Sequence, residues 1–260
     1  MNLKDYLYYQ DDWATIYCGD CLEVKPQMPP LSMDLILTSP PYNASKEYEK
    51  DLHPDQYFIL IEKFMKFAYG IGKHRLAIIT SFDIQNKTYG NMKILPVIFR
   101  ALSQWQLKDM IAWNQLNTES DTAWGSWASP RAPHFRHQME YIVIAYKGQW
   151  HGDYEGKIAA RDFTRWTIDS WRMNCSRKQN HPAEFPIGLP NRLIQLLNGN
   201  HGVTLDPFMG SGTTLVAAKN LNRKSIGIEI NPDYCEIAVK RLRQEVFDFK
   251  NGNGQKSINS

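Results

Sequence analysis

The segment Ser39-Pro40-Pro41-Tyr42-Asn43 combines a hydroxyl group, two prolines and an aromatic ring just after a short apolar run. The two prolines make the loop stiff and supply no backbone N–H, so its carbonyl groups and the Ser39 hydroxyl are fixed hydrogen-bond acceptors. An amino group, with two N–H donors, matches that geometry, and the ring of Tyr42 offers a flat face to a planar base. Because a Pro-Pro turn alone is usually only a turn, the interpretation depends on what else the chain carries.

A glycine turn late in the chain predicts a binding site for a nucleoside cofactor with a small anionic group. The turn runs from Asp206 through Gly210 and Gly212 to Thr214, between an expected strand and an expected helix. Glycine lets the backbone approach a ligand closely, and the free N–H groups at the start of a helix face an anion. Glu229 ends the next expected strand, where an acid can accept hydrogen bonds from ribose hydroxyls.

S-adenosylmethionine fits these features better than a dinucleotide does. It carries a ribose and an amino-acid carboxylate, and a carboxylate suits a helix N-terminus as well as a phosphate does. The dinucleotide fingerprint needs a third glycine, and Leu215 occupies that position. A nicotinamide oxidoreductase would also leave the amine-binding loop unexplained. A metal site is not expected, because the C-x-x-C of Cys18 and Cys21 lacks a second pair of ligands.

The chain around these residues alternates between apolar strands and amphipathic helices. Gly70 is expected to end the first long helix and Pro232 to open the last one. Such alternation predicts an open, mostly parallel α/β sheet, whose strands carry ligand-binding turns at their carboxyl ends. Strands are expected at 34–38, 76–80, 107–113, 141–146, 203–206 and 225–229, and helices at 55–70, 91–105, 189–198, 213–220 and 232–247.

Residues 147–180 interrupt this alternation with an irregular, basic segment. The segment has seven Lys and Arg residues against four acids, and the whole chain has a net charge of only +3. Trp150, Trp166 and Trp171 lie among the basic residues, and we expect them to be exposed on a surface that meets phosphate. The alternative interpretation is an ordinary solvated insertion.

Length and composition favour one large domain with an insertion. The chain has 260 residues, of which 43% are hydrophobic and 22% charged, which excludes a wholly disordered protein. No apolar run approaches the ~20 residues of a membrane helix, and the N-terminus lacks the apolar core of a secretion signal. We therefore expect a protein inside the cell with reduced cysteines, and a disordered polar tail at 251–260.

Together these motifs resemble those of the DNA amino-methyltransferases, which methylate an exocyclic base amine with S-adenosylmethionine. By this resemblance residues 39–43 are the catalytic loop and residues 206–214 are the cofactor turn. Because the loop precedes the turn, the order resembles the circularly permuted class labelled beta. Protein and ribosomal amine methyltransferases with an Asn-Pro-Pro-Tyr loop generally run the other way. The resemblance covers about residues 13–245, and besides the two turns it includes residues 16–21, Trp124-Gly125-Ser126-Trp127, Ser129-Pro130, Glu140-Tyr141 and His181-Pro182-Ala183-Glu184-Phe185-Pro186.

The resemblance implies a circularly permuted Rossmann-like methyltransferase fold with an inserted recognition region. Residues 1–146 and 181–250 would form the catalytic domain, and residues 147–180 would recognise double-stranded DNA. Catalysis would fall to Ser39, Pro40 and Tyr42, the first two accepting the hydrogens of the target amine. The implied cofactor-binding residues are Asp20, Ala183, Glu184, Asp206, Pro207, Phe208, Gly210, Ser211, Gly212, Thr213 and Glu229. The DNA-binding residues expected in the insertion are Arg161, Arg165, Arg172, Arg177 and Lys178.

The resemblance favours N4 of cytosine as the methylated atom and keeps N6 of adenine as the alternative. Cytosine enzymes of the family typically carry Ser at the first loop position, as Ser39 does, and adenine enzymes carry Asp. The target base would be flipped out to stack on Tyr42, and its amine would attack the sulfonium methyl in line. A separate restriction endonuclease is an implied partner. A DNA-binding module without catalysis would need neither this loop nor Glu229.

Overall fold

The computed structural model describes residues 2–24, 28–45, 51–115, 139–150, 158–174 and 185–244. In this part of the chain no helix is long and apolar enough to cross a membrane. The strands are β1 (Leu7–Gln10), β2 (Ala14–Cys18), β3 (Met33–Thr38), β4 (Gly72–Ser81), β5 (Asp83–Asn86), β6 (Gly90–Lys93), β7 (Gln106–Gln115), β8 (Met139–Tyr146), β9 (Ser170–Met173), β10 (Thr204–Asp206) and β11 (Ser225–Glu229). A 3-10 helix, Leu3–Tyr6, precedes α1 (Cys21–Val24), α2 (Pro54–Ile71), α3 (Ile94–Ala101), α4 (Ala160–Trp166), α5 (Gly188–Leu197), α6 (Thr213–Asn220) and α7 (Pro232–Arg243).

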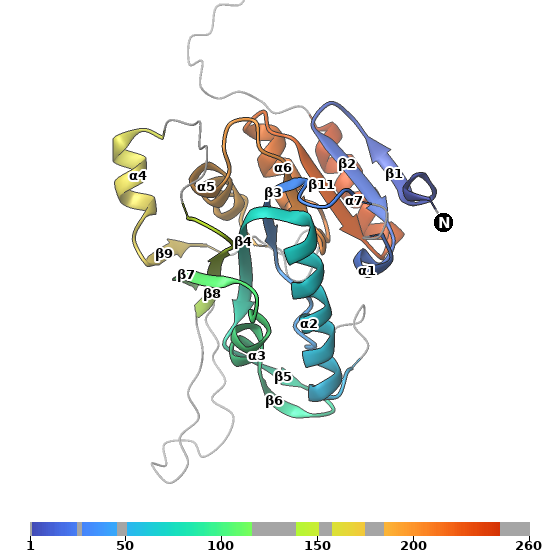
Figure 1. Ribbon diagram of the computed structural model, residues 1–260, viewed down its shortest axis with the longest axis vertical. Helices are drawn as coiled ribbons and strands as arrows, with labels where there is room; N and C mark the ends of the chain where they lie inside the picture. Colours follow the sequence, from blue (N-terminus) through green and yellow to red (C-terminus); the bar gives the residue numbers. More distant parts are fainter. Residues whose placement is uncertain are drawn as a thin grey trace, which may run out of the picture.

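Nine strands form one sheet in the order β1-β2-β11-β10-β3-β4-β8-β7-β9 (Figure 1). The strands from β2 to β4 in this order run parallel, and β8 is antiparallel to both β4 and β7. The edge strands are β1, antiparallel to β2, and β9, parallel to β7. This confirms the mostly parallel α/β sheet expected from the sequence. Because β3 and β10 are parallel neighbours, the loops that follow them leave the same edge of the sheet.

Helices cover both faces of the sheet. Alternate residues of a strand point to opposite sides, so neighbouring residues pack against different helices. In β3, Ile36 packs into a core cluster with α1, α2 and α3, while Leu35 and Leu37 belong to a second cluster with α5 and α6. In β4, Leu76 belongs to the first cluster and Ala77 to the second. Burial on both faces explains why the central strands are continuous apolar runs rather than alternating ones.

Several helix boundaries differ from the expected ones. Gly70 lies inside α2, whose C-terminal cap is Gly72 with extended backbone (φ −73°, ψ 137°). The helix expected at 91–105 is limited to α3, because the residues before it pair with β5 as strand β6. The last helix ends at Arg243 rather than near residue 247. The expected tail at 251–260 lies outside the described residues.

The tryptophans of the 147–180 segment are buried in the core or packed against it, so the expectation that they are exposed is wrong. Trp171 lies on β9 with 1% of its surface exposed, and its indole N–H donates to the Trp166 carbonyl at 3.1 Å. Trp150 and Trp166 are half-buried and pack against the same core cluster. The guanidinium of Arg75 and the ammonium of Lys108 each lie 5.1 Å from the centre of the Trp150 ring. Because β9 pairs with β7, Trp171 lies in the same core cluster as Leu189 and Leu193 of α5, which explains its burial.

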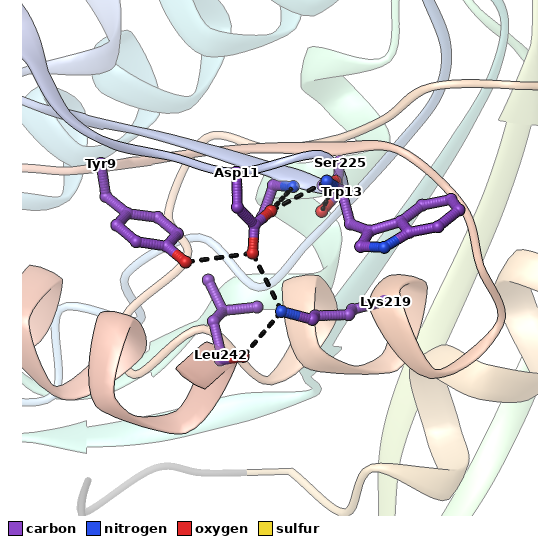
Figure 2. Close-up of polar contacts among 7 residues, drawn as sticks. Tyr9, Asp11, Trp13, Lys219, Ser225 and Leu242 are labelled. Carbon is purple, nitrogen blue, oxygen red and sulfur yellow. Dashed lines mark hydrogen bonds and ion pairs between the residues drawn. The ribbon is translucent and has the colours of Figure 1, made fainter. Parts of the chain in front are cut away.

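A cluster of polar contacts fastens the N-terminal hairpin β1–β2 to the C-terminal helices (Figure 2). The Asp11 carboxylate accepts hydrogen bonds from Tyr9 Oη at 3.0 Å and from the backbone N–H of Trp13 at 2.8 Å. It also accepts a hydrogen bond from Lys219 Nζ of α6 at 2.9 Å, and the same ammonium donates to the Leu242 carbonyl of α7 at 2.8 Å. Burial alone would raise the pKa of Asp11, but these hydrogen bonds outweigh it and lower that pKa. The hairpin is therefore tied to two helices that are distant in sequence.

Candidate active site

The expected catalytic loop and the expected cofactor turn line one cavity of about 610 Å³. The cavity opens where β2, β3, β10 and β11 end, as expected for parallel strands whose loops share one edge. The residues expected at the site that line it are Asp20, Ser39, Pro40, Tyr42, Pro207, Phe208, Gly210, Ser211, Thr213 and Glu229. The fold thus brings together residues from the two ends of the chain.

Asp206, also expected to bind the cofactor, is not among the residues that line the cavity, and it links the two loops instead. Only 1% of its surface is exposed, and its carboxylate accepts hydrogen bonds from Thr38 Oγ1 and Thr214 Oγ1, both at 2.6 Å. The backbone N–H of Phe208 donates a further bond at 3.2 Å. Burial raises the pKa of Asp206 to about 6, although these hydrogen bonds favour the charged form. Asp206 therefore contributes to the site by holding the loops rather than by contact with the cavity.

Glycine is required in the turn for two different reasons. Gly210 (φ 51°) and Gly212 (φ 80°) both adopt left-handed backbone, which other residues rarely do. A Cβ atom added to Gly212 would also lie 2.7 Å from the Cβ of Ala238 on α7. Among the described residues, those that line the cavity include Gly210 but not Gly212. Both glycines that the sequence singled out therefore adopt left-handed backbone, and Gly212 also allows α7 to pack closely against the turn.

Arg241 of α7 stabilises the cofactor turn through hydrogen bonds. The sequence did not single it out. Its guanidinium donates to the Ser211 carbonyl at 2.9 Å, to Ser211 Oγ at 2.8 Å and to Thr213 Oγ1 at 3.1 Å. These atoms belong to the segment that opens helix α6. A fixed turn keeps its cavity-facing atoms in one geometry, which a bound cofactor requires.

Glu229 is fixed at the end of β11 by the backbone of the turn. Its Oε2 accepts from the N–H of Gly210 at 3.0 Å, and its Oε1 accepts from the N–H of Asn231 at 2.9 Å. Burial raises the pKa of Glu229, and the two backbone bonds oppose that shift. Each oxygen of a carboxylate has more than one lone pair, so the group can still accept hydrogen bonds from a ligand in the cavity.

Asp20 lines the same cavity just after β2, the strand next to β11, where the N–H of Gly19 donates to the Glu229 carbonyl at 2.9 Å. Its Oδ1 accepts from the backbone N–H of Leu22 at 2.8 Å, which orients the carboxylate at the start of α1. Ala183 and Glu184, also expected to touch the cofactor, lie outside the described residues. Phe185, the next residue, does line the cavity.

The catalytic loop is held by its neighbours in a defined conformation. Tyr57 Oη of α2 donates to the carbonyl of Pro41 at 3.0 Å. Asn43 (φ 57°) bonds the backbone of Leu52 in both directions, donating at 2.7 Å and accepting at 2.8 Å. Asn86 of the β5–β6 hairpin donates to the Asn43 carbonyl at 2.6 Å. The loop is therefore built into the surrounding structure, as its two prolines suggested.

The Ser39 hydroxyl belongs to a polar chain that ends on a carboxylate. Ser39 Oγ donates to Tyr42 Oη at 3.2 Å, and Tyr42 Oη donates to Glu140 Oε2 at 3.2 Å. Glu140, at the start of β8, also lines the cavity. The sequence marked Glu140 only as part of a resemblance, with no role assigned. No local signal indicated this contact, because Tyr42 and Glu140 are 98 positions apart in the chain.

The basic residues expected to meet DNA lie apart from the cavity. Arg161 and Arg165 are exposed on α4, and Arg172 is exposed on β9. They come from neighbouring elements at one end of the sheet, where α4 also packs on α5. Arg177 and Lys178 lie outside the described residues.

A family comparison decides which class of protein carries this site. Residues 33–240 match the family model for DNA methylases of the N6 and N4 type. The chain belongs to the DNA methylase family. The matched region contains both the catalytic loop and the cofactor turn, so the resemblance read from the sequence is confirmed.

Two relatives of this DNA methylase match it over most of their length. The type II methyltransferase M.ScaI of Streptomyces caespitosus is 30% identical over 263 residues, covering 92% of this chain and 84% of the relative. The DNA adenine methyltransferase YhdJ of Escherichia coli (strain K12) is 28% identical over 259 residues, covering 90% of this chain and 84% of the relative. The protein is therefore a DNA methyltransferase of the N6/N4 family.

Solved structures confirm the methyltransferase fold of this DNA methylase. PvuII DNA methyltransferase, which is cytosine-N4-specific, matches with a TM-score of 0.74 and 21% identity, covering 92% of this chain and 89% of the other. TTHA0409, a putative DNA modification methylase of Thermus thermophilus, was solved with S-adenosylmethionine. It matches with a TM-score of 0.69 and 23% identity, covering 87% of this chain and 92% of the other. Membership of the DNA methylase family implies S-adenosylmethionine as the cofactor, and the fixed Glu229 carboxylate and the left-handed turn at Gly210 fit it.

Proposed function

We propose that this DNA methylase transfers a methyl group from S-adenosylmethionine to the exocyclic N4 amine of cytosine in double-stranded DNA. The observation that carries the proposal is the Ser39 hydroxyl, which lines the same cavity as Glu229 and the glycine turn. Adenine enzymes of the kind that this sequence resembles carry Asp at the position of Ser39. The likeness in fold to a cytosine-N4-specific enzyme supports the same base.

In the proposed mechanism, the residues of the cavity bind and orient the two reactants. Glu229 would accept from the ribose hydroxyls and Asp20 from the adenine amine of S-adenosylmethionine. The bound cofactor supplies an electrophilic methyl group. Ser39 Oγ and the Pro40 carbonyl accept the two hydrogens of the cytosine amine, which helps its nitrogen to become pyramidal and to direct its lone pair away from the ring. The catalysis is mostly positioning and placement of acceptors.

The target base must leave the duplex, because the reacting residues lie inside a cavity. We propose that the flipped cytosine stacks on Tyr42, whose side chain is half-buried beside Ser39. Arg161, Arg165 and Arg172 are proposed to contact the DNA, since they are exposed on neighbouring elements outside the cavity. Within the 147–180 recognition segment, Arg177 and Lys178 remain proposed contacts.

N6 of adenine is the second candidate, because a relative that matches 90% of this chain is a DNA adenine methyltransferase. Adenine and cytosine both present an amine beside a ring-nitrogen acceptor, so the acceptors of the cavity suit either base. A separate restriction endonuclease with the same recognition sequence is the proposed biological partner, in line with the type II relatives.

One experiment decides between the bases. Genomic DNA amplified in vitro, which carries no methylated bases, is incubated with the protein and S-adenosylmethionine and then digested to nucleosides. Mass spectrometry is expected to detect N4-methyldeoxycytidine in this sample and not in one without protein. Detection of N6-methyldeoxyadenosine in its place would overturn the choice of cytosine. Sequencing of the same methylated DNA would give the recognition sequence.

A further inference from the structure

Glu140 is the carboxylate at the end of the chain of hydrogen bonds that begins at Ser39. The links from Ser39 Oγ to Tyr42 Oη and from Tyr42 Oη to Glu140 Oε2 are both 3.2 Å. The Gln115 amide adds a hydrogen bond to Glu140. Glu140 retains access to the cavity, while its strand partners Ser81 of β4 and Trp113 of β7 flank it in the sheet.

The negative charge of Glu140 fixes the direction of both hydrogen bonds that connect it, through Tyr42, to Ser39. An ionised carboxylate can only accept, so the Tyr42 hydroxyl must donate to Glu140. The single hydrogen of Tyr42 is then used, and its oxygen can only accept from Ser39. Ser39 therefore directs its own hydrogen at Tyr42 and leaves its lone pairs for the cavity. A serine hydroxyl, which can donate or accept, is made into an acceptor.

We propose that Glu140 is a positioning residue for methyl transfer: acting through Tyr42, it holds the Ser39 hydroxyl as an acceptor for the target amine and receives the proton that the amine releases. The lone pair of the nitrogen forms a bond to the methyl carbon as the sulfur–methyl bond breaks. The electron pair of the broken bond stays on sulfur. The methylated nitrogen then loses a proton to Ser39 Oγ. The Ser39 proton moves to Tyr42, and the Tyr42 proton moves to Glu140, which ends neutral.

Protonation of Glu140 before the reaction reverses the direction of these hydrogen bonds. A neutral carboxyl group donates to Tyr42, Tyr42 then donates to Ser39, and Ser39 turns its hydrogen toward the amine, where two donors repel. Burial raises the pKa of Glu140, although hydrogen bonds from Gln115 and Tyr42 oppose the shift. The titratable groups of the described chain that face this carboxyl are Tyr42 and, behind it, Tyr57 of α2; Ser81, Trp113 and Gln115 on the flanking strands do not titrate. Activity should therefore fall as the pH drops through the pKa of Glu140.

The inference rests on the proposed amine methylation, but it is independent of which base is methylated. The test measures transfer of tritium-labelled methyl from S-adenosylmethionine to amplified, unmethylated genomic DNA between pH 5 and 9. For Glu140→Gln we expect kcat to fall about 10²-fold, as for other proton-transfer groups. We also expect the fall of kcat at low pH, the acidic limb of the pH profile, to disappear in this variant, because glutamine does not titrate. The Kd for S-adenosylmethionine, measured by calorimetry, should stay within about two-fold of the wild-type value.

Tyr42→Phe interrupts the chain from the other side and should lower kcat to a similar degree. The double variant Tyr42→Phe/Glu140→Gln should lose little more than either single variant, because both changes break one chain. Tyr8 and Glu236 provide matched controls: Tyr8 Oη donates to Glu236 Oε2 at the same 3.2 Å, between β1 and α7. Tyr8→Phe and Glu236→Gln should keep the wild-type kcat and pH profile.

Several outcomes would overturn the proposal. They are a wild-type kcat in Glu140→Gln, an acidic limb that persists unchanged in that variant, or additive losses in the double variant. A loss of S-adenosylmethionine binding and of thermal stability that matches the loss of kcat would assign Glu140 a structural role instead. If Glu140→Gln does not fold, the kcat and pH profile of Tyr42→Phe decide. Wild-type protein that methylates no base would instead contradict the proposed function, before any variant is compared.

Discussion

Thr38 and Asp206 join the two ligand-binding loops through one buried hydrogen bond. Thr38 Oγ1 donates to Asp206 Oδ1 at 2.6 Å, and at most 1% of either residue is exposed. Thr38 ends β3 directly before Ser39, and Asp206 ends β10 directly before Pro207. The bond therefore fixes Ser39, the proposed acceptor of the amine, relative to the cofactor turn. Methyl transfer depends on that spacing, because small displacements of reacting groups slow a reaction strongly.

Thr38→Val removes this bond while keeping the shape of the side chain. The Asp206 carboxylate would then lack one buried donor, so we expect the free energy of unfolding to fall by about 1–3 kcal/mol. Methyl transfer should fall as well, because the two loops lose a shared anchor. Urea denaturation and the tritium assay check the two effects. Thr164→Val, on the exposed helix α4, is the control and should change stability by no more than about 0.5 kcal/mol.

Ser39→Ala should strongly reduce methyl transfer without affecting binding of the cofactor. The variant lacks the hydroxyl acceptor, so we expect kcat to fall by about 10²–10³-fold, as for loss of other catalytic hydrogen bonds. Binding of S-adenosylmethionine should be unchanged in calorimetry, since its proposed contacts are Asp20 and Glu229. Ser32→Ala, whose hydroxyl bonds the Pro29 carbonyl in another loop, serves as the control. Full activity in Ser39→Ala would refute the proposed role of this hydroxyl.

Gly212→Ala separates turn geometry from helix packing. The new Cβ would lie 2.7 Å from the Ala238 Cβ, in addition to the strain at φ +80°. Gly90 has a similar φ of +73° with no atom within 4 Å of an added Cβ, so Gly90→Ala carries the backbone strain alone. We expect about 1–2 kcal/mol of destabilisation for Gly90→Ala and more for Gly212→Ala in urea denaturation. Equal effects would show that the contact with Ala238 is relieved without cost.

Asp11→Asn should weaken the attachment of the N-terminal hairpin and make stability less dependent on pH. We expect a loss of about 1–2 kcal/mol at pH 7, because the Lys219 ammonium loses its charged partner. The pKa of Asp11 is lower in the folded state than its ordinary value of 3.8, so its contribution is complete above that value. The contribution disappears as the pH falls through the lowered pKa. The wild type and the variant should therefore converge in urea denaturation at acid pH, whereas the exposed neighbour Asp12→Asn should match the wild type throughout.

Removing Arg161, Arg165 and Arg172 together should weaken DNA binding and reduce its dependence on salt. Each lost phosphate contact lowers the slope of log affinity against log salt by about one. Fluorescence anisotropy with labelled duplex DNA measures this slope at several salt concentrations. The control removes the exposed Lys63, Lys66 and Lys240 from α2 and α7, which lowers the net charge equally. An equal change in slope for both triple variants would show that the effect comes from net charge and not from contacts of these arginines with DNA.

Local sequence signals were enough to predict that the loop at Ser39, the glycine turn at Gly210 and the acid at Glu229 belong to one site, and all three line one cavity. Each is a local signal, because residue type and short spacing specify a stiff loop, a left-handed turn or an acid at the end of a strand. The apolar runs of the central strands were equally local. They predicted a parallel sheet, and the meeting of the two loops follows from the parallel order of its strands.

The contacts of residues with partners far away in the sequence became apparent from the three-dimensional fold alone. Trp171 is buried because β9 pairs with β7, and Gly212 must be glycine because α7 packs against it. Arg241 holds the cofactor turn, and Glu140 reaches Ser39 through Tyr42, from segments far away in the chain. Strand order and helix packing create these contacts, and neither is encoded in the spacing of neighbouring residues. The physical reason is that the chemistry of a side chain is local, whereas its environment is set by the whole fold.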